Sequence, residues 1–263
     1  MDEKLINALA EELHAALSDR KPITPLTNRD YAITLDDAYR ISLQFLSQRE
    51  ALGERVVGKK IGVTSKPAQA MLQVAEPDFG FLTDRMQIAD GATVSMSQYN
   101  LIAPRAEGEI AFIMADDLSA ANISAEEVLS ATEAIAPSFE IVDSRITDWK
   151  IRIEDTVADN ASSGLFALSE ARINPRDLDL AAVVLNMTLN GQSAGQGIGS
   201  VVLGHPCEAV AWLANALNKL GIPLRRHEII LSGTLGVPVP VAAGDHLEMH
   251  LSGMGTASLR FTD

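Results

Sequence analysis

The second half of the chain consists of short apolar segments separated by glycines, and this pattern restricts the possible folds more than any other feature. Four such segments lie near the end of the chain: 228–231, 237–241, 246–251 and 257–261. Segments of this length between glycine turns are typical of strands in an antiparallel or mixed sheet. The pair Asn190-Gly191, which follows the apolar segment 183–189, is a strong signal for a two-residue hairpin turn.

The first part of the chain is predicted to be helical. Leucines recur every fourth residue from Leu5 to Leu17, which indicates an amphipathic helix over about 2–19. Thr34 is a good N-cap for a second helix that ends near Gly53. Because strands and helices alternate too irregularly for a doubly wound sheet or a TIM barrel, we expect an α+β fold. We expect one domain over 1–263, with 1–53 as a helical elaboration and 54–263 as a mixed-β catalytic core.

Several local features of the core carry specific expectations. Segment 56–65 is predicted to be a strand in which the adjacent Lys59 and Lys60 point to opposite faces, one of them to solvent. Segment 76–82 is interpreted as a turn-rich loop that carries Asp78. The alternating glycines at 195–199 indicate a flexible loop, since no Lys-Ser/Thr follows them as in a phosphate-binding loop.

Residues that could also serve in a site are given structural roles. A helix is predicted from Pro206 to Leu220, with His205 as a hydrogen-bonding residue at its start and Cys207 buried within it. Asp143, Arg145 and Asp159 are interpreted as a structural ion-pair network.

Composition excludes several classes of function. The formal net charge is −14 and the chain shows no cluster of Lys and Arg, which argues against binding to nucleic acid or to an anionic membrane surface. The single cysteine, Cys207, rules out a disulfide within the chain. We find no signal-peptide pattern and no apolar run of membrane-spanning length, so we expect a cytoplasmic protein.

Three glutamates are the strongest candidates for a functional site. Glu107 and Glu109 lie two apart at the start of an apolar strand, so their side chains should share one face. Glu140 lies in a second apolar segment. Three carboxylates on neighbouring strands would form an all-oxygen site for a hard divalent cation. By pattern alone, a strand with one solvated face is the favoured explanation, because any half-exposed strand shows this alternation.

Six segments together resemble a known family. They are 57–65, 73–80, 104–112, 140–149, 155–162 and 203–206. Across nearly the whole chain they are similar to the 2-oxopent-4-enoate (2-hydroxypenta-2,4-dienoate) hydratases, a branch of the fumarylacetoacetate hydrolase-like superfamily. The Glu-x-Glu pair with the later Glu140 is specific to the superfamily, and Pro77-Asp78-Phe79-Gly80 is more specific to the hydratase branch.

The resemblance implies a fold, a cofactor and a set of site residues. The implied fold is the mixed β-roll of the superfamily, preceded here by N-terminal helices. Glu107, Glu109 and Glu140 match the ligands of a divalent metal, Mg²⁺ or Mn²⁺. Lys60 matches the active-site lysine and Asp78 the active-site acid, while Ser162 lies in a loop that the family places near the substrate.

The implied reaction is the addition of water to a small 2-hydroxydienoic acid, which gives 4-hydroxy-2-oxopentanoate. Lys60 and Asp78 would supply the general acid and base in either order, or Lys60 would only hold the substrate carboxylate. Family members form homo-oligomers, and a 4-oxalocrotonate decarboxylase is a possible partner. The alternatives are that decarboxylase activity itself, although no extra Arg or Lys for a second carboxylate stands out, or a non-catalytic subunit of the hydratase–decarboxylase complex. A carbon–carbon bond hydrolase of the wider superfamily is a weaker alternative, since it needs a water-activating dyad that the sequence does not show.

Overall fold

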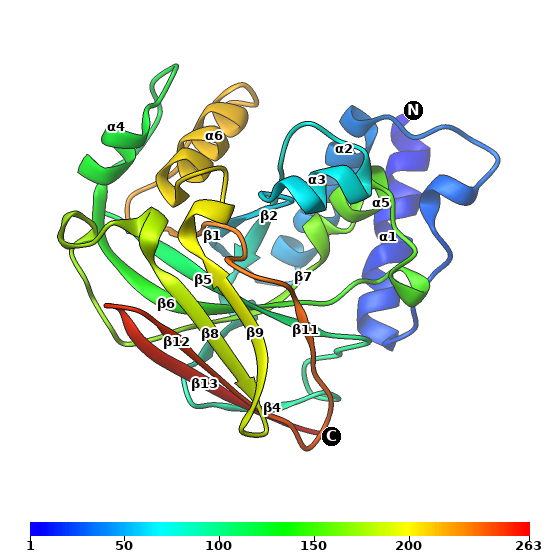
Figure 1. Cartoon of the computed structure of the whole chain (residues 1–263). Helices are drawn as coiled ribbons and strands as arrows, with labels where there is room; N and C mark the ends of the chain where they lie inside the picture. Colours follow the sequence, from blue (N-terminus) through cyan, green and yellow to red (C-terminus); the bar gives the residue numbers. More distant parts are fainter.

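The N-terminal segment forms two long helices, as the leucine spacing predicts. The computed structural model describes residues 1–263, and it begins with α1 (Glu3–Asp19) and α2 (Leu35–Ala51) (Figure 1). The Thr34 side chain caps α2 in a capping box with Asp37. The buried faces of α1 and α2 form a small hydrophobic cluster of their own, which also includes Val157 and Ala158.

The remaining helices are shorter and lie around the sheets. They are α3 (Lys66–Leu72), α4 (Ala125–Ser130), α5 (Ile153–Ala158) and α6 (Pro206–Asn218). Helix α6 confirms two predictions, because the ring Nδ1 of His205 accepts a hydrogen bond from the Cys207 amide at 3.1 Å and Cys207 is buried. Seven 3₁₀ helices complete the set: η1 (Leu26–Asn28), η2 (Asp84–Met86), η3 (Thr147–Trp149), η4 (Asn160–Ser162), η5 (Pro175–Asp177), η6 (Leu180–Ala182) and η7 (Gly199–Val201).

The larger of two sheets has eight strands and carries the candidate site. Its strands are β1 (Val56–Gly62), β2 (Asp78–Thr83), β3 (Gln87–Ala89), β5 (Arg105–Met114), β6 (Thr132–Val142), β7 (Ser163–Leu168), β10 (Ile229–Leu231) and β11 (Val239–Pro240). Seven of them run in the order β2-β1-β10-β5-β6-β7-β3, and β11 pairs with β5. Strands β1 and β10 are parallel, as are β3 and β7, whereas the other pairs are antiparallel.

The second sheet has five strands and forms the other half of the β-roll. Its strands are β4 (Thr93–Ser95), β8 (Val184–Leu189), β9 (Gln192–Ile198), β12 (His246–Leu251) and β13 (Gly255–Thr262), in the order β4-β13-β12-β8-β9. The turn between β8 and β9 has positive φ at both Asn190 and Gly191, which confirms the predicted hairpin. Helices with two mixed or antiparallel sheets confirm the α+β class.

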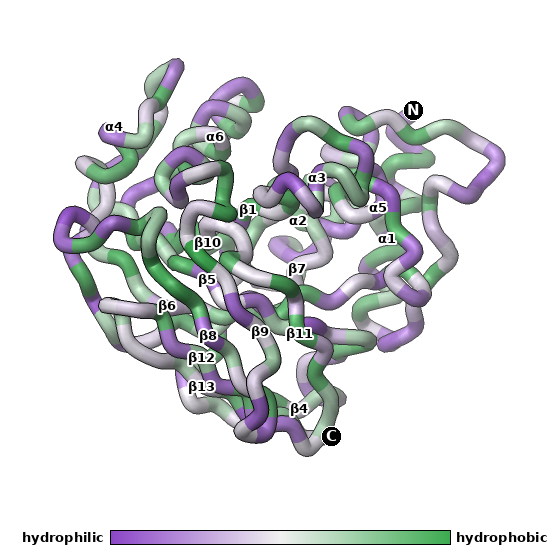
Figure 2. Tube along the Cα trace, viewed as in Figure 1, coloured by the Kyte–Doolittle hydropathy of each residue, from purple (hydrophilic) through white to green (hydrophobic).

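The main hydrophobic core lies between the sheets and under α6. It comprises 45 buried residues contributed by both sheets and by α6, and it is separate from the N-terminal cluster. Figure 2 shows hydrophilic residues concentrated in the outer loops. No helix in the structure is both long enough and apolar enough to cross a membrane.

Two segments that the sequence indicates as loops are strands, so those predictions are wrong. Asp78–Thr83 forms β2, whose six residues are all buried, and Gln192–Ile198 forms β9. Glycine at 197 is required because a Cβ there would lie 1.9 Å from the Leu235 carbonyl oxygen. The glycines of β9 therefore permit close backbone packing and do not mark a loop.

The expectation that one of the two adjacent lysines faces solvent is also wrong. Lys59 and Lys60 do lie on opposite faces of β1, but both are buried. The Lys59 ammonium pairs with the Glu228 carboxylate at 2.5 Å, a partner 169 residues away in the chain. That ion pair allows Lys59 to be buried without an uncompensated charge.

Candidate active site

Strand β5 presents Glu107 and Glu109 on one face, as the period of two predicts. The intervening Gly108 faces the second sheet, where a Cβ would lie 2.7 Å from Leu185 Cδ1. Glycine therefore lets β8 pack directly behind the two carboxylates. The Oε2 atom of Glu109 accepts a hydrogen bond from the Gly233 amide at 2.7 Å, which orients that side chain.

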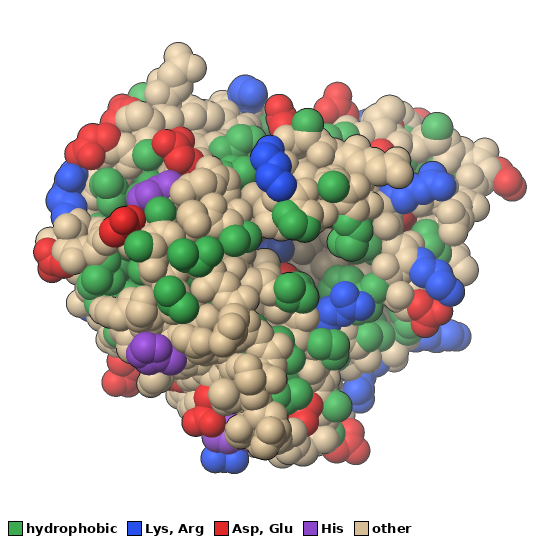
Figure 3. Space-filling model, viewed as in Figure 1, with side chains coloured by type: hydrophobic (Ala, Val, Ile, Leu, Met, Phe, Trp, Pro, Cys, Tyr) green, Lys and Arg blue, Asp and Glu red, His purple; other side chains and the backbone are tan.

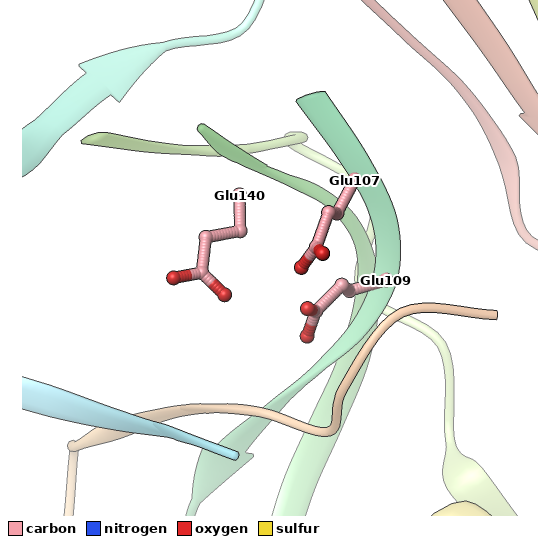
Figure 4. Close-up of side chains that lie close together, drawn as sticks. All are labelled: Glu107, Glu109 and Glu140. Carbon is pink, nitrogen blue, oxygen red and sulfur yellow. The ribbon is translucent and has the colours of Figure 1, made fainter. Parts of the chain in front are cut away.

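Strand β6 brings Glu140 to the same place. Glu140 lies directly opposite Glu107 in the antiparallel ladder between β5 and β6. One carboxylate oxygen from each of Glu107, Glu109 and Glu140 lies within 4.8 Å of the others. In Figure 4 the carboxylates of Glu107 and Glu109 point from β5 toward that of Glu140. The structure thus brings together the three glutamates that the sequence singles out.

The cluster fits a divalent cation on its own chemistry. Glu109 and Glu140 are fully buried; Oε1 of Glu109 and Oε2 of Glu140 have no hydrogen-bond partner, and Oε1 of Glu140 has only an ion pair with Lys60 at 3.3 Å. Burial, together with the charges of Glu140 and Glu107, raises the pKa of Glu109 well above its usual range. Burial raises the pKa of Glu140 and the Lys60 ammonium lowers it, and the net result is a pKa of about 7. A hard cation with oxygen ligands would satisfy these atoms and remove the repulsion.

Lys60 lies between the glutamates and a backbone carbonyl. Its Nζ is 3.3 Å from Glu140 Oε1 and donates a hydrogen bond to the Ala161 carbonyl at 3.0 Å. Burial alone would lower the pKa of Lys60, but the surrounding carboxylates, led by Glu140 and Asp78, raise it above its ordinary value. Lys60 is therefore a buried ammonium held at a defined position beside the cluster.

Asp78 is placed next to Lys60 by the pairing of β1 with β2. Gly62 pairs with Asp78, and a Cβ on Gly62 would lie 2.1 Å from Asp78 Oδ1 and 3.4 Å from Lys60 Nζ. The two side chains thus converge over the backbone of Gly62. Burial raises the pKa of Asp78, although the Lys60 ammonium lowers it, and Oδ1 has no hydrogen-bond partner. Such a perturbed acid beside a buried amine is typical of acid–base sites.

A left-handed turn supports both β2 and Lys60. Asn160, Ala161 and Ser162 have φ values of 53°, 50° and 52°, a conformation that costs about 1–2 kcal/mol for each non-glycine residue. The Asn160 side-chain amide donates to the Phe81 carbonyl at 2.9 Å and accepts from the Phe81 amide at 2.8 Å. This side chain takes the place of a neighbouring strand at the edge of β2, and the turn directs the Ala161 carbonyl to Lys60.

Ser162 belongs to this turn, but its hydroxyl lies among structural groups. Its Oγ is 3.2 Å from Thr156 Oγ1 and 3.4 Å from Asp159 Oδ2. Asp159 in turn accepts from the backbone amide and Nε of the fully buried Arg145. Asp143 accepts from the amides of Ile102 and Ala103. The buried Arg145–Asp159 ion pair confirms that part of the predicted network as structural.

The sequence interpretation missed Arg105, which is also on β5. It is half-buried, and its guanidinium carbon lies 4.4 Å from the centroid of the Trp149 ring. The alternation that selects Glu107 and Glu109 includes position 105 as well, so the signal was present in the sequence. In the structure Arg105 forms no ion pair with a carboxylate, and the sequence alone does not reveal this.

The surface near the site is hollowed. Figure 3 shows a hollow in the centre of this face, with hydrophobic, Lys and Arg side chains at its edge. Three surface cavities elsewhere on the molecule contain none of the three glutamates. One of them has a volume of about 410 Å³ and is lined by residues that include Thr27, Tyr31 and Arg152. The buried carboxylates, and not the size of a cavity, identify the candidate site.

Comparisons with known proteins agree on one family. The family model described as fumarylacetoacetate (FAA) hydrolase C-terminal matches residues 50–262. A 2-hydroxyhexa-2,4-dienoate hydratase from Comamonas testosteroni is 56% identical over 262 residues, covering 100% of this chain and 99% of its own length. A 2-hydroxypent-2,4-dienoate hydratase from Pseudomonas putida is 53% identical over 222 residues, covering 84% of this chain and 100% of its own length.

A solved structure shows the same fold over the whole chain. The 4-oxalocrotonate decarboxylase from Pseudomonas putida G7, solved with magnesium and adipate, matches with a TM-score of 0.94 at 34% sequence identity. The match covers 99% of this chain and 98% of that one, so the N-terminal helices are included.

Proposed function

Since the chain belongs to the fumarylacetoacetate hydrolase family, we propose that it is a hydratase acting on 2-hydroxypenta-2,4-dienoate (2-oxopent-4-enoate). The product is 4-hydroxy-2-oxopentanoate, formed in the meta-cleavage degradation of aromatic compounds. The observation that carries this proposal is the convergence of Lys60 and Asp78 beside the three glutamates. Two hydratases of short 2-hydroxydienoates at 56% and 53% identity support the reaction and the substrate class.

Glu107, Glu109 and Glu140 are proposed to hold the divalent cation, Mg²⁺ or Mn²⁺. Three carboxylates leave coordination positions for two oxygens of a 2-oxo acid. When bound, the cation supplies positive charge that stabilises the negative charge developing on the 2-oxygen. The magnesium in the solved decarboxylase structure supports a cation of this type.

Lys60 and Asp78 are proposed to move the protons of the reaction. Hydration requires a proton at C5 of the dienol as its 2-hydroxyl proton leaves, removal of a proton from the water that adds at C4, and a proton at C3 of the resulting enolate. Lys60 is a buried ammonium and can donate, while the unpartnered Oδ1 of Asp78 can accept. The reverse assignment, or Lys60 as an electrostatic partner of the substrate carboxylate, uses the same geometry. Ser162 is proposed to contribute to substrate binding through the turn that carries it.

Two alternative functions are kept as outcomes of the test. The likeness to the decarboxylase structure favours a second candidate, decarboxylation of 4-oxalocrotonate. Asp78 favours hydration, because the segment Pro77-Asp78-Phe79-Gly80 that carries it resembles the hydratase branch more specifically. A non-catalytic subunit would not need Lys60 and Asp78 to converge. One domain over residues 1–263, a homo-oligomer, a decarboxylase partner and a cytoplasmic location stay predictions.

The test follows the dienol absorbance of 2-hydroxypenta-2,4-dienoate with purified protein and Mg²⁺ or Mn²⁺. Metal-dependent loss of the dienol with formation of 4-hydroxy-2-oxopentanoate would support the hydratase. Release of CO₂ from 4-oxalocrotonate without turnover of the dienol would establish the decarboxylase instead. If the protein turns over neither compound, the non-catalytic subunit is the interpretation that remains.

Asp78→Asn separates catalysis from metal binding. We expect it to retain metal affinity and to lower kcat by about 10²–10⁴-fold, the usual contribution of a general acid or base. Asp116→Asn is the matched control, since Asp116 is exposed and its side chain forms no hydrogen bond or ion pair. A rate for Asp78→Asn equal to that of the control would remove Asp78 from the mechanism.

A further inference from the structure

Arg105 differs from the other sheltered arginines of this chain. Five arginines are not exposed, and four of them form ion pairs: Arg29 with Glu12, Arg40 with Glu3 and Asp37, Arg49 with Glu54, and Arg145 with Asp159. Arg105 forms no ion pair and donates no side-chain hydrogen bond. In a chain with 35 acidic residues, a sheltered guanidinium without a carboxylate is available for an external anion.

Arg105 lies on the same face of β5 as the glutamates. Successive residues of a strand alternate between faces, so 105, 107 and 109 point the same way. A spacing of two residues places the Cα atoms of Arg105 and Glu107 about 7 Å apart. Arg105 is thus adjacent to the metal cluster, at the end of the row away from Glu109, where an anion bound near the cluster can reach it.

The guanidinium is also held in place before any ligand binds. It stacks on the ring of Trp149 at 4.4 Å, and Trp149 Nε1 donates a hydrogen bond to the Ala103 carbonyl at 2.9 Å. Asp143 accepts from the amides of Ile102 and Ala103, which fixes the segment that leads into β5. Because the face of the guanidinium stacks on the aromatic ring, the N–H groups at its edge are free to bind a carboxylate.

We propose that Arg105, stacked on Trp149, is a carboxylate-binding subsite beside the metal cluster. The inference rests on the proposed function, because it assumes that a 2-oxo acid binds at the glutamates. Two carboxylates have this chemistry: the 1-carboxylate of the 2-oxo acid itself, and a second carboxylate at the far end of a dicarboxylic 2-oxo acid. In the first case Arg105 anchors every 2-oxo acid that binds, and in the second it favours dicarboxylic acids over monocarboxylic ones.

The experiment is a calorimetric titration of Mn²⁺-loaded protein with two unreactive ligands, 2-oxopentanoate and 2-oxohexanedioate. Wild type is compared with Arg105→Gln, which removes the charge and keeps a side chain of moderate length. Loss of a charged hydrogen bond should weaken binding by about 10- to 100-fold. Equal weakening for both ligands assigns Arg105 to the 1-carboxylate, and weakening for 2-oxohexanedioate alone assigns it to the distal carboxylate.

Two further variants guard against a change in folding. Arg105→Lys keeps the charge but loses the planar fork, so it should bind between wild type and Arg105→Gln. Trp149→Ala removes the stacking platform and should weaken the same ligand as Arg105→Gln. Mn²⁺ affinity and melting temperature should match wild type in both Arg105 variants.

Unchanged affinity of Arg105→Gln for both ligands would overturn the subsite, as would a wild type that binds neither ligand. The titration needs no turnover, so its result is distinguishable from failure of the hydratase assay. A wild type without hydratase activity that still loses ligand affinity on Arg105→Gln would refute hydration and retain the subsite.

Discussion

At the scale of single residues, the candidate site is a concentration of negative charge that the fold must compensate. Two like charges 4.8 Å apart repel by about 3 kcal/mol at an effective dielectric constant of 20. Glu107, Glu109 and Glu140 contain three such pairs, whereas Lys60 contributes one positive charge. Lys60 alone does not balance the three carboxylates and Asp78, so a divalent cation is the natural complement.

Glu109→Gln tests this balance with little change in shape. The glutamine oxygen can still accept the Gly233 amide that now bonds to Oε2 of Glu109 at 2.7 Å, which leaves its NH₂ group toward the cation. We expect metal affinity and turnover to fall together, with affinity lower by at least about 10-fold, the loss expected for one charged ligand interaction. Titration calorimetry with Mn²⁺ and the dienol assay measure the two quantities.

Glu133→Gln is the matched control because Glu133 lies on β6, the strand of Glu140, but is exposed. It changes the net charge by the same amount and should leave metal affinity unchanged. If Glu109→Gln binds Mn²⁺ as tightly as this control, the three glutamates do not form the metal site.

The residue-scale predictions succeeded where the signal was local. The spacing of Glu107 and Glu109 fixes their common face through the pleat alone. The expectation that one of Lys59 and Lys60 faces solvent was wrong, because the ion-pair partner that lets Lys59 be buried, Glu228, lies 169 residues away. No periodicity near Lys59 reveals such a partner, and the same reason explains why the unpaired state of Arg105 was not foreseen.

At the scale of elements, the turn η4 connects the chemistry to the fold. Its three left-handed residues are strained, and they persist because Asn160 bonds to both backbone groups of Phe81. The prediction of a loop over 76–82 was wrong because the sequence near this segment does not show its contact with Asn160. Pro77 and Gly80 are turn signals in isolation, but the edge of β2 is completed by a side chain 79 residues away.

Asn160→Ala should therefore affect stability and catalysis together. It leaves the buried amide and carbonyl of Phe81 without partners, which should cost about 2–5 kcal/mol in the free energy of unfolding. The Ala161 carbonyl would no longer be held against Lys60, so kcat should fall while Mn²⁺ affinity stays near that of wild type. Urea unfolding, dienol kinetics and metal titration measure the three quantities.

Asn122→Ala provides the comparison, since Asn122 also has positive φ but is exposed and its side chain forms no hydrogen bond. Its cost should stay below about 1 kcal/mol, as for most surface substitutions, and its kcat should equal that of wild type. Equal kinetics for the two variants would show that η4 supports only the fold.

At the scale of the whole molecule, the N-terminal helices support the site from behind. The cluster formed by α1 and α2 includes Val157 and Ala158 of α5, the helix that leads into η4. Tyr39 of α2 also stacks on Phe79 of β2, with ring centroids 4.4 Å apart. The two helices predicted from leucine spacing and capping therefore pack against the two elements that place Lys60 and Asp78, a role that their amphipathic pattern alone does not show.

Because the three proposed metal ligands come from β5 and β6, two central strands of the larger sheet, cation binding should stabilise the entire fold. A ligand that binds only the folded state at 100 times its Kd adds about 2.7 kcal/mol to the free energy of unfolding. For a chain of this length, that gain corresponds to a rise in Tm of about 5 °C or more. Thermal unfolding with Mn²⁺ should show this rise, and a chelator should reverse it. Glu140→Gln should abolish the rise, whereas Glu133→Gln should retain it; the same Tm for wild-type protein with and without Mn²⁺ would contradict a cation site among the three glutamates.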